Sequence, residues 1–114
     1  PAMKAAQMHF DEINEKGGVH GRKIRLVGED HGYQVPKAVQ AANKLINRDK
    51  VFAMFMGLGT PHNLAAFKLQ ERKNIPNFLP LSAARQMLDD PIGLKFVSFS
   101  SYYDGIRTGL KYMK

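Results

Sequence analysis

The stretch Val51-Phe-Ala-Met-Phe-Met-Gly57-Leu-Gly59-Thr60-Pro61-His-Asn-Leu64 decides the fold. Its first six residues are apolar, as in a strand that is buried on both faces of a parallel sheet. Two glycines then allow a tight turn, Thr60 is a good N-cap, and Pro61 falls at the first helical position. The stretch therefore predicts a strand, a turn and the start of a helix. In a parallel sheet this places free backbone N–H groups at the carboxyl edge, where an anion can bind.

The residues on both sides of this stretch alternate between helical and strand patterns. Helices are expected at about residues 2–16, 36–50, 61–73 and 103–114, and strands at 23–27, 51–56, 77–79 and 95–99. On the third of these helices we expect Leu64, Ala65 and Leu69 to face inward. This order predicts an α/β fold of three layers, α/β/α, with a mainly parallel sheet. Because a helix precedes the first expected strand, we expect the chain to be part of a longer domain.

Composition and charge narrow the classes of function. The chain has 114 residues, enough for one domain, and its 44% hydrophobic content is typical of a folded protein. Its net charge of +7 includes 17 basic residues scattered through every segment, without the basic and aromatic clusters that bind nucleic acid. The longest apolar run is too short to span a membrane, and the chain contains no signal-peptide pattern. We therefore expect a folded domain with no nucleic acid partner.

The sequence contains no complete motif for catalysis, metal binding or a cofactor. The absence of cysteine excludes disulfides, zinc–thiolate sites and a cysteine nucleophile. Gly57 and Gly59 form only part of a dinucleotide fingerprint, because His62 stands where its third glycine belongs. The histidines lie in separate segments, and His31, beside two acidic residues, is interpreted as part of a solvated loop. The sequence therefore predicts no metal, no cofactor and no enzyme activity.

Several segments, taken together, resemble one family. The run Asp11-Glu-Ile-Asn-Glu-Lys-Gly-Gly-Val-His-Gly-Arg-Lys-Ile-Arg-Leu26 resembles the signature "F…IN…GGI.G..I.L" of type I periplasmic binding proteins. The agreement continues in order through residues 36–46, 49–53, 57–60 and 74–76. Within that family, the chain is similar to the branch that binds leucine, isoleucine and valine for ABC importers.

This resemblance implies a two-lobed receptor that closes on a small ligand and passes it to membrane permease subunits. Residues 1–114 correspond to part of the N-terminal lobe, without its first strand and without the C-terminal lobe. The implied ligand is a branched-chain or other amino acid, or an organic acid, and the implied location is periplasmic or extracellular. A missing strand and lobe would expose apolar surface, which predicts either self-association or a longer chain that covers this surface.

The resemblance also implies a ligand site at the turn from Leu58 to Thr60. Thr60 corresponds to the hydroxyl residue that binds the ligand's α-carboxylate in this family, and Gly59 precedes it in the turn. Leu58 corresponds to a wall of the same pocket. The alternative role for Thr60 is that of a helix cap alone.

A second part of the implied site follows Pro80. Leu81 corresponds to the position whose backbone C=O accepts from the ligand ammonium, and Ala83 to a position that often carries a second hydroxyl. Alanine has no hydroxyl, and Ser82 substitutes for it if the register shifts by one residue. Tyr102 is expected at the mouth of the cleft. The alternative is that these small residues only let the loop pass close to the sheet.

Two other classes of protein remain as alternatives. One is a ligand-sensing domain of a receptor or a transcription regulator with the same fold, which the segment after the second lobe would reveal. The other is a small enzyme of the flavodoxin-like type, in which bound flavin or phosphate would occupy residues 57–60. The incomplete glycine motif disfavours the enzyme.

Overall fold

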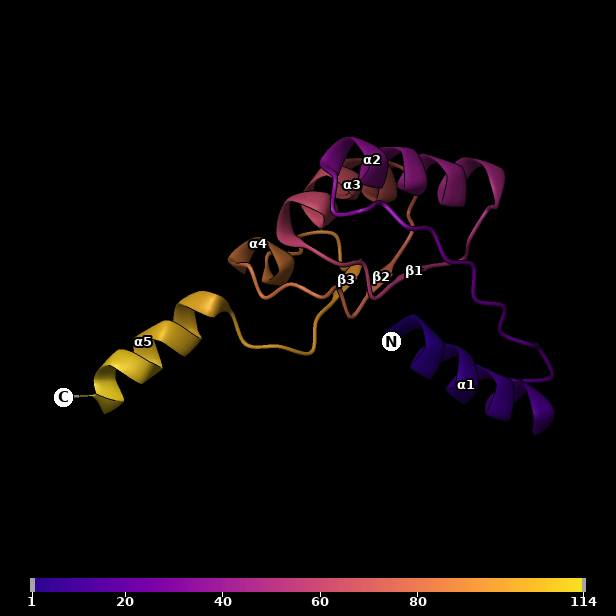
Figure 1. The fold of residues 1–114 in the computed structure, drawn as a ribbon, viewed down its shortest axis with the longest axis horizontal. Helices are drawn as coiled ribbons and strands as arrows, with labels where there is room; N and C mark the ends of the chain where they lie inside the picture. Colours follow the sequence, from indigo (N-terminus) through magenta and orange to yellow (C-terminus); the bar gives the residue numbers. More distant parts are fainter. Residues whose placement is uncertain (1, 114) are drawn as a thin grey trace.

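A three-stranded parallel sheet lies at the centre of the computed structural model, which describes residues 2–113 (Figure 1). The strands are β1 (Met54–Phe55), β2 (Asn77–Phe78) and β3 (Lys95–Phe96), in the spatial order β1-β2-β3. The pairing is in register, so that Phe55, Phe78 and Phe96 lie in one row across the sheet. Parallel pairing requires crossover connections, and the helices supply them.

Helices lie on both sides of this sheet (Figure 1). Their bounds are α1 (Ala2–Glu15), α2 (Val35–Asn43), the π-helical turn η1 (Lys44–Arg48), α3 (Thr60–Arg72), α4 (Arg85–Leu88) and α5 (Tyr102–Tyr112). The pair α2 and α3 covers one face, and α1 lies toward the other, where Phe10 contacts Phe55 with ring centroids 5.6 Å apart. The α/β class and the layered arrangement are thus confirmed. Among residues 2–113, no helix is long and apolar enough to cross a membrane.

The core lies between the helix pair α2–α3 and the sheet. Its buried apolar side chains come from α2, η1, α3 and the α4 region: Ala38, Ala42, Leu45, Ile46, Ala66, Phe67, Ala83 and Met87. A buried amide pair crosses this core, because Asn77 Nδ2 donates to Gln70 Oε1 at 3.0 Å. The core is therefore small and is held by polar as well as apolar contacts.

The central strand differs from its sequence prediction. Only two of the six apolar residues of 51–56 pair as a strand, and none of the six is buried. Phe52 is 87% exposed. The expectation of a strand buried on both faces is therefore wrong for the described residues. β1 is one of the two edge strands of the sheet they form, so one of its sides has no strand beside it.

Helix α3 is rotated relative to the predicted orientation. Its buried positions are His62, Asn63, Ala66, Phe67 and Gln70, whereas the predicted inner residues Leu64, Ala65 and Leu69 are only half-buried. Two polar side chains set this orientation. An asparagine near the start of α3 is hydrogen-bonded to the turn after β1, and Gln70 near its end is hydrogen-bonded to a residue of β2. Hydrophobic spacing alone did not predict these anchors.

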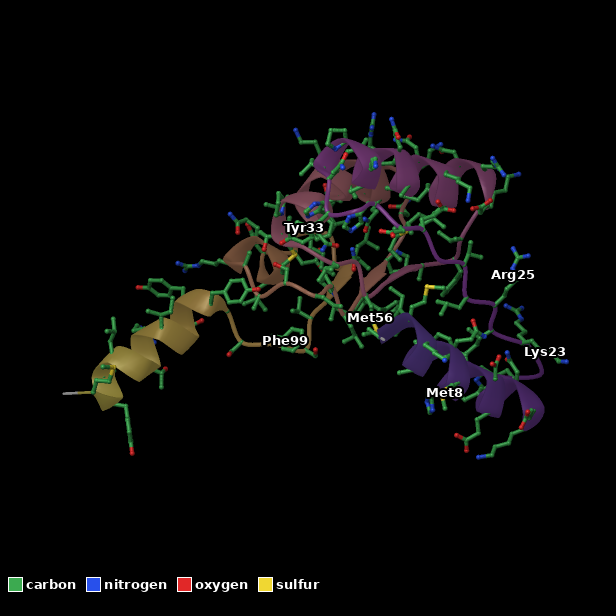
Figure 2. The ribbon with its side chains drawn as sticks, viewed as in Figure 1. Met8, Lys23, Arg25, Tyr33, Met56 and Phe99 are labelled. Atoms are coloured by element: carbon green, nitrogen blue, oxygen red, sulfur yellow. The ribbon has the colours of Figure 1, made fainter. Side chains whose placement is uncertain are left out.

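The segment 23–27 forms no paired strand, which corrects the sequence prediction. Lys23 and Arg25 project outward (Figure 2), and Ile24 and Leu26 are half-buried, so the predicted alternation of exposure is present. A side chain replaces the missing neighbour, because the amide of Asn14 donates to the Ile24 C=O and accepts from its N–H, both at 2.7 Å. Within residues 2–113 there is no strand with which this segment pairs.

A carboxylate shapes the turn before β3. Asp90 Oδ2 accepts from the backbone N–H of Lys95 at 2.7 Å. Partial burial raises the pKa of Asp90, but the nearby backbone N–H groups, that of Lys95 above all, and the positive charge of Lys95 outweigh this effect and hold the pKa below its ordinary value. The carboxylate is therefore ionised at neutral pH and fixes the entry into β3.

Helix α5 carries its apolar side chains on an exposed face. Ser101 caps the helix by accepting from the N–H of Asp104 at 3.0 Å. Ile106, Leu110 and Met113, which were predicted to share one side, are all exposed in the described structure. The amphipathic pattern is real, but its apolar face contacts no other described element closely enough to be buried.

We predict that Met87→Ala lowers the free energy of unfolding by about 2–5 kcal/mol, because it leaves a cavity in the core. Met87 is 0% exposed. The matched control is Met8→Ala on α1, since Met8 is 67% exposed and its truncation should change stability by no more than about 0.5 kcal/mol. Urea unfolding measures both. Equal effects of the two substitutions would contradict the described core.

Candidate functional site

Two loops meet at the carboxyl edge of the sheet, one after β1 and one after β2. Leu58 and Leu81 form a parallel bridge that continues the pairing of the two strands. The N–H of Leu81 donates to the C=O of Gly57 at 2.9 Å, and the N–H of Gly59 points to the C=O of Leu81 at 3.4 Å. The structure therefore brings together the two loops that the sequence singled out.

The turn into α3 is built on Gly59 rather than on Thr60. Gly59 is the N-cap residue, with φ 94° and ψ 136°, and Thr60 and Pro61 are the first two helical residues. The sequence-based assignment of Thr60 as N-cap is therefore wrong, and among the described residues its hydroxyl is hydrogen-bonded to Ser82 Oγ. A positive φ of this size favours glycine, which explains the residue at position 59.

One buried amide holds this turn in place. Asn63 Nδ2 donates to the C=O of Gly57 and to the C=O of Gly59, both at 2.8 Å. Asparagine offers two N–H donors on a rigid plane, so a single side chain can fix both glycine carbonyls. The sequence pattern did not single out Asn63. Its position one turn into the helix after two glycines was the only signal.

His62 fills the space behind the turn. Its side chain is 4% exposed and stacks on His31, with ring centroids 4.6 Å apart, and it packs against the tilted ring of Tyr33 at 4.4 Å. Figure 2 shows Tyr33 beside the start of α3. A methyl group on Gly59 would overlap the His62 ring. This stack brings the 28–34 loop to the site, and neither His62 nor Tyr33 was expected there.

Within residues 2–113, no group of three or more histidine, aspartate or glutamate side chains is placed to hold a metal ion. His31 instead accepts a hydrogen bond from the N–H of Tyr33 at 3.0 Å. Both ring nitrogens of His62 lack a hydrogen-bond partner among the described residues, so the ring is held by packing alone.

Two hydroxyl groups link the 57–60 turn to the 81–83 loop. Thr60 Oγ1 and Ser82 Oγ lie 2.6 Å apart. Ser82 is 3% exposed, and its Oγ accepts from the N–H of Ala84 at 3.3 Å, whereas Thr60 is half-buried. Ser82 therefore lies beneath Thr60 and not beside it on the open surface.

Of the remaining predicted site residues, Ala83 is buried, whereas Leu58 and Tyr102 have exposed side chains. Ala83 is buried, its C=O accepts from the N–H of Tyr102 at 2.8 Å, and its own N–H donates no hydrogen bond to a described residue. Leu58 and Tyr102 are more than half exposed. The Thr60 hydroxyl, the N-terminus of α3 and the N–H of Ala83, which has no described hydrogen-bond partner, thus belong to the two loops that meet at this edge.

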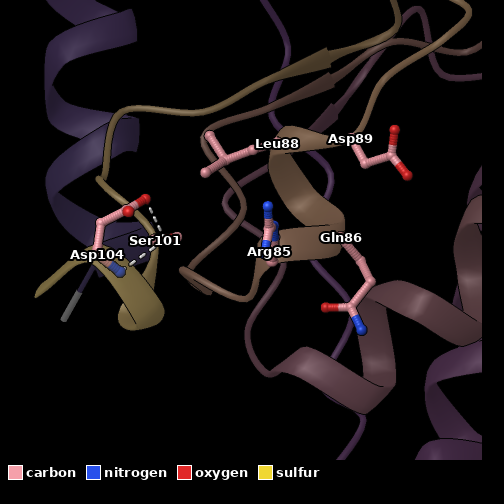
Figure 3. A pocket seen from close by; sticks show the side chains of 6 residues that line it. All are labelled: Arg85, Gln86, Leu88, Asp89, Ser101 and Asp104. Atoms are coloured by element: carbon pink, nitrogen blue, oxygen red, sulfur yellow. Dashed lines mark hydrogen bonds between the residues drawn. The ribbon is translucent and has the colours of Figure 1, made fainter. Parts of the chain in front are cut away.

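A hollow of about 530 Å³ adjoins this edge, between α4 and the start of α5 (Figure 3). Its lining residues are Arg85, Gln86, Leu88, Asp89, Ser101 and Asp104. Asp104 is already bonded to Ser101 at 2.6 Å, and the guanidinium of Arg85 lies 5.5 Å from the Tyr103 ring centroid. The hollow does not include Thr60, so it extends the edge rather than forming the hydroxyl site.

Comparisons with known proteins identify the family to which the chain is similar. The profile of the family described as periplasmic binding protein matches residues 1–114. Among curated proteins, Leu/Ile/Val-binding protein homolog 7 from Brucella abortus is 30% identical over 86 residues, which are 75% of this chain and 21% of that relative. The chain thus spans about a fifth of the length of this relative.

Solved structures agree on the fold. A substrate-binding periplasmic protein from Ralstonia solanacearum matches with a TM-score of 0.84 and 28% identity, over 98% of this chain and 33% of that chain. A fatty acid ABC transporter substrate-binding protein from Thermomonospora curvata matches with a TM-score of 0.83 and 28% identity, over 96% of this chain and 27% of that one. Both similarities span the sheet edge described above.

We predict that Gly59→Ala lowers the free energy of unfolding by at least about 1–3 kcal/mol, the range for a residue forced into a sparsely populated backbone region. The added methyl group would also displace His62. The matched control is Gly109→Ala in α5, where a methyl group meets no atom within 4 Å. That substitution should raise stability by about 0.5–1 kcal/mol. Thermal unfolding of both variants distinguishes the two positions, and a neutral Gly59→Ala would refute the described turn.

Proposed function

The chain belongs to the periplasmic binding protein family, and from that premise we propose that it forms part of the N-terminal lobe of an extracytoplasmic solute receptor. Residues 1–114 form this lobe except for its first strand. A C-terminal lobe completes the receptor. The observation that carries this proposal is the meeting of the 57–60 turn and the 81–83 loop at one sheet edge. Ligands of open α/β folds bind at such an edge.

The ligand group that this edge suits is a carboxylate. The Thr60 hydroxyl, the N-terminus of α3 and the N–H of Ala83 are all hydrogen-bond donors or positive dipole ends. No acidic side chain is bonded to any of these groups among residues 2–113. A net charge of +7 adds a favourable field for an anion.

Two ligand classes fit such a carboxylate site, because related proteins bear both names. One relative is named for leucine, isoleucine and valine, and one solved structure is named for fatty acids. In either case the receptor closes its lobes on the ligand and delivers it to the permease subunits of an ABC importer. It acts by binding in the periplasm or outside the cell, and catalyses no reaction.

The ligand class is tested by titrating the full-length receptor with L-leucine, L-isoleucine and octanoate in a calorimeter. We expect one of the two classes to bind with measurable heat. Binding of the amino acids alone would assign the amino acid class, and binding of octanoate alone the fatty acid class. If none of these carboxylates binds, the proposed carboxylate site is wrong.

We predict that Thr60→Ala in the receptor weakens the binding of that carboxylate by about 1.5–3 kcal/mol, roughly 10- to 150-fold. This is the range for a hydrogen bond to a charged group, which the substitution removes. The matched control is Thr108→Ala, because Thr108 lies exposed on α5 and away from the site. Calorimetry measures both affinities. Unchanged affinity of the Thr60 variant would refute its assignment as a carboxylate ligand.

A further inference from the structure

Ser82 carries a buried hydroxyl, and among residues 2–113 its only hydrogen-bonded acceptor is the Thr60 hydroxyl. Its side chain is 3% exposed, and Thr60 Oγ1 lies 2.6 Å from its Oγ. A hydroxyl carries one donor hydrogen and two acceptor lone pairs. One lone pair of Ser82 Oγ accepts from the N–H of Ala84 at 3.3 Å. The hydrogen of Ser82 still needs an acceptor, because a buried donor without a partner loses its hydration and gains nothing in return.

Among the described residues, Thr60 Oγ1 is the acceptor that this hydrogen finds. We propose that Ser82 donates to Thr60 and is therefore a positioning residue, which turns the Thr60 hydrogen toward the bound carboxylate. This inference rests on the function proposed above and assigns a role to Ser82 that differs from direct ligand contact.

The burial of Ser82 argues against the opposite direction of this hydrogen bond. If Thr60 donated to Ser82, the Ser82 hydrogen would be left inside the protein without an acceptor. Thr60 is half-buried, so its own hydrogen can reach solvent or a ligand instead. The difference in burial between the two hydroxyls therefore fixes the direction of the hydrogen bond.

The order Ser82 to Thr60 to carboxylate has two consequences. The Thr60 oxygen is polarised by the hydrogen bond that it accepts, which strengthens the bond that it donates. Its rotation about χ1 is also restricted before the ligand arrives, so less freedom is lost on binding. The loop after β2 thus contributes to the anion site through Thr60.

A double-mutant cycle tests this role. The full-length receptor is titrated with L-isoleucine and with octanoate as Ser82→Ala, Thr60→Ala and the double variant. We expect Ser82→Ala to weaken binding about tenfold when Thr60 is present, and less than about twofold when Thr60 is already alanine, because Ser82 acts through the Thr60 hydroxyl. A structural role alone would weaken binding equally in both backgrounds, and that result would overturn the proposal.

Further variants separate folding from positioning. Ser82→Cys replaces the hydroxyl by a somewhat larger thiol, which is a weak donor, and should weaken binding as Ser82→Ala does. The control Thr108→Ala removes a hydroxyl that lies exposed on α5 and away from Thr60, and should leave affinity unchanged. If Thr60→Ala has no effect, the proposed function fails. If Thr60→Ala weakens binding but Ser82→Ala does not, only the role of Ser82 fails.

A measurement without ligand checks the direction itself. Neutron diffraction from deuterated crystals locates hydroxyl deuterons. We expect a deuteron on Ser82 Oγ, on the line to Thr60 Oγ1. A deuteron on Thr60 that points to Ser82 would overturn the proposal, whatever the receptor binds.

Discussion

The carbonyl oxygen of Gly57 is the atom on which the arrangement of the site depends. It accepts one hydrogen bond from the N–H of Leu81 at 2.9 Å and another from the Asn63 side chain at 2.8 Å. The first ties the turn after β1 to the loop after β2, and the second ties the same turn to α3. Because a carbonyl oxygen has two lone pairs, both are used and the three segments hold one another. Thr60 and Ser82 face each other only because this junction sets their separation.

Polar anchors, more than apolar spacing, set the orientation of α3. Asn63 is bonded to the glycine turn and Gln70 to Asn77 in β2, so two amides seven residues apart define the face that meets the sheet. Seven residues make about two helical turns, which places both amides on one side. His62 is carried inward by the same rotation and is buried without a hydrogen bond for its ring. Its stacking on His31 and its tilted contact with Tyr33 offset part of the cost of burying a polar ring.

The sequence predicted those features that depend on local residues. Glycines 17 and 18 end α1, a proline starts α2, and the Gly-Thr-Pro turn starts α3, and all three boundaries are confirmed to within about two residues. Features that depend on distant residues were not predictable in this way. The length of β1 depends on its neighbours in the sheet, and the segment 23–27 is held by Asn14 instead of by a strand. The burial of Ser82 depends on a loop packing that no local pattern encodes.

Under the proposed function, the division between buried and exposed groups separates the binding of a carboxylate from the selection of the rest of the ligand. The groups that we propose to face a carboxylate are a hydroxyl, a helix terminus and a backbone N–H, and every carboxylate satisfies them alike. Leu58 and Tyr102, which carry side chains of distinct shape, are exposed at the rim of this edge. Backbone donors cannot discriminate between one ligand chain and another, whereas exposed side chains can be exchanged without disturbing the junction at Gly57. Substitutions at the exposed side chains, with the carboxylate-binding groups unchanged, would therefore change which ligand the same fold binds.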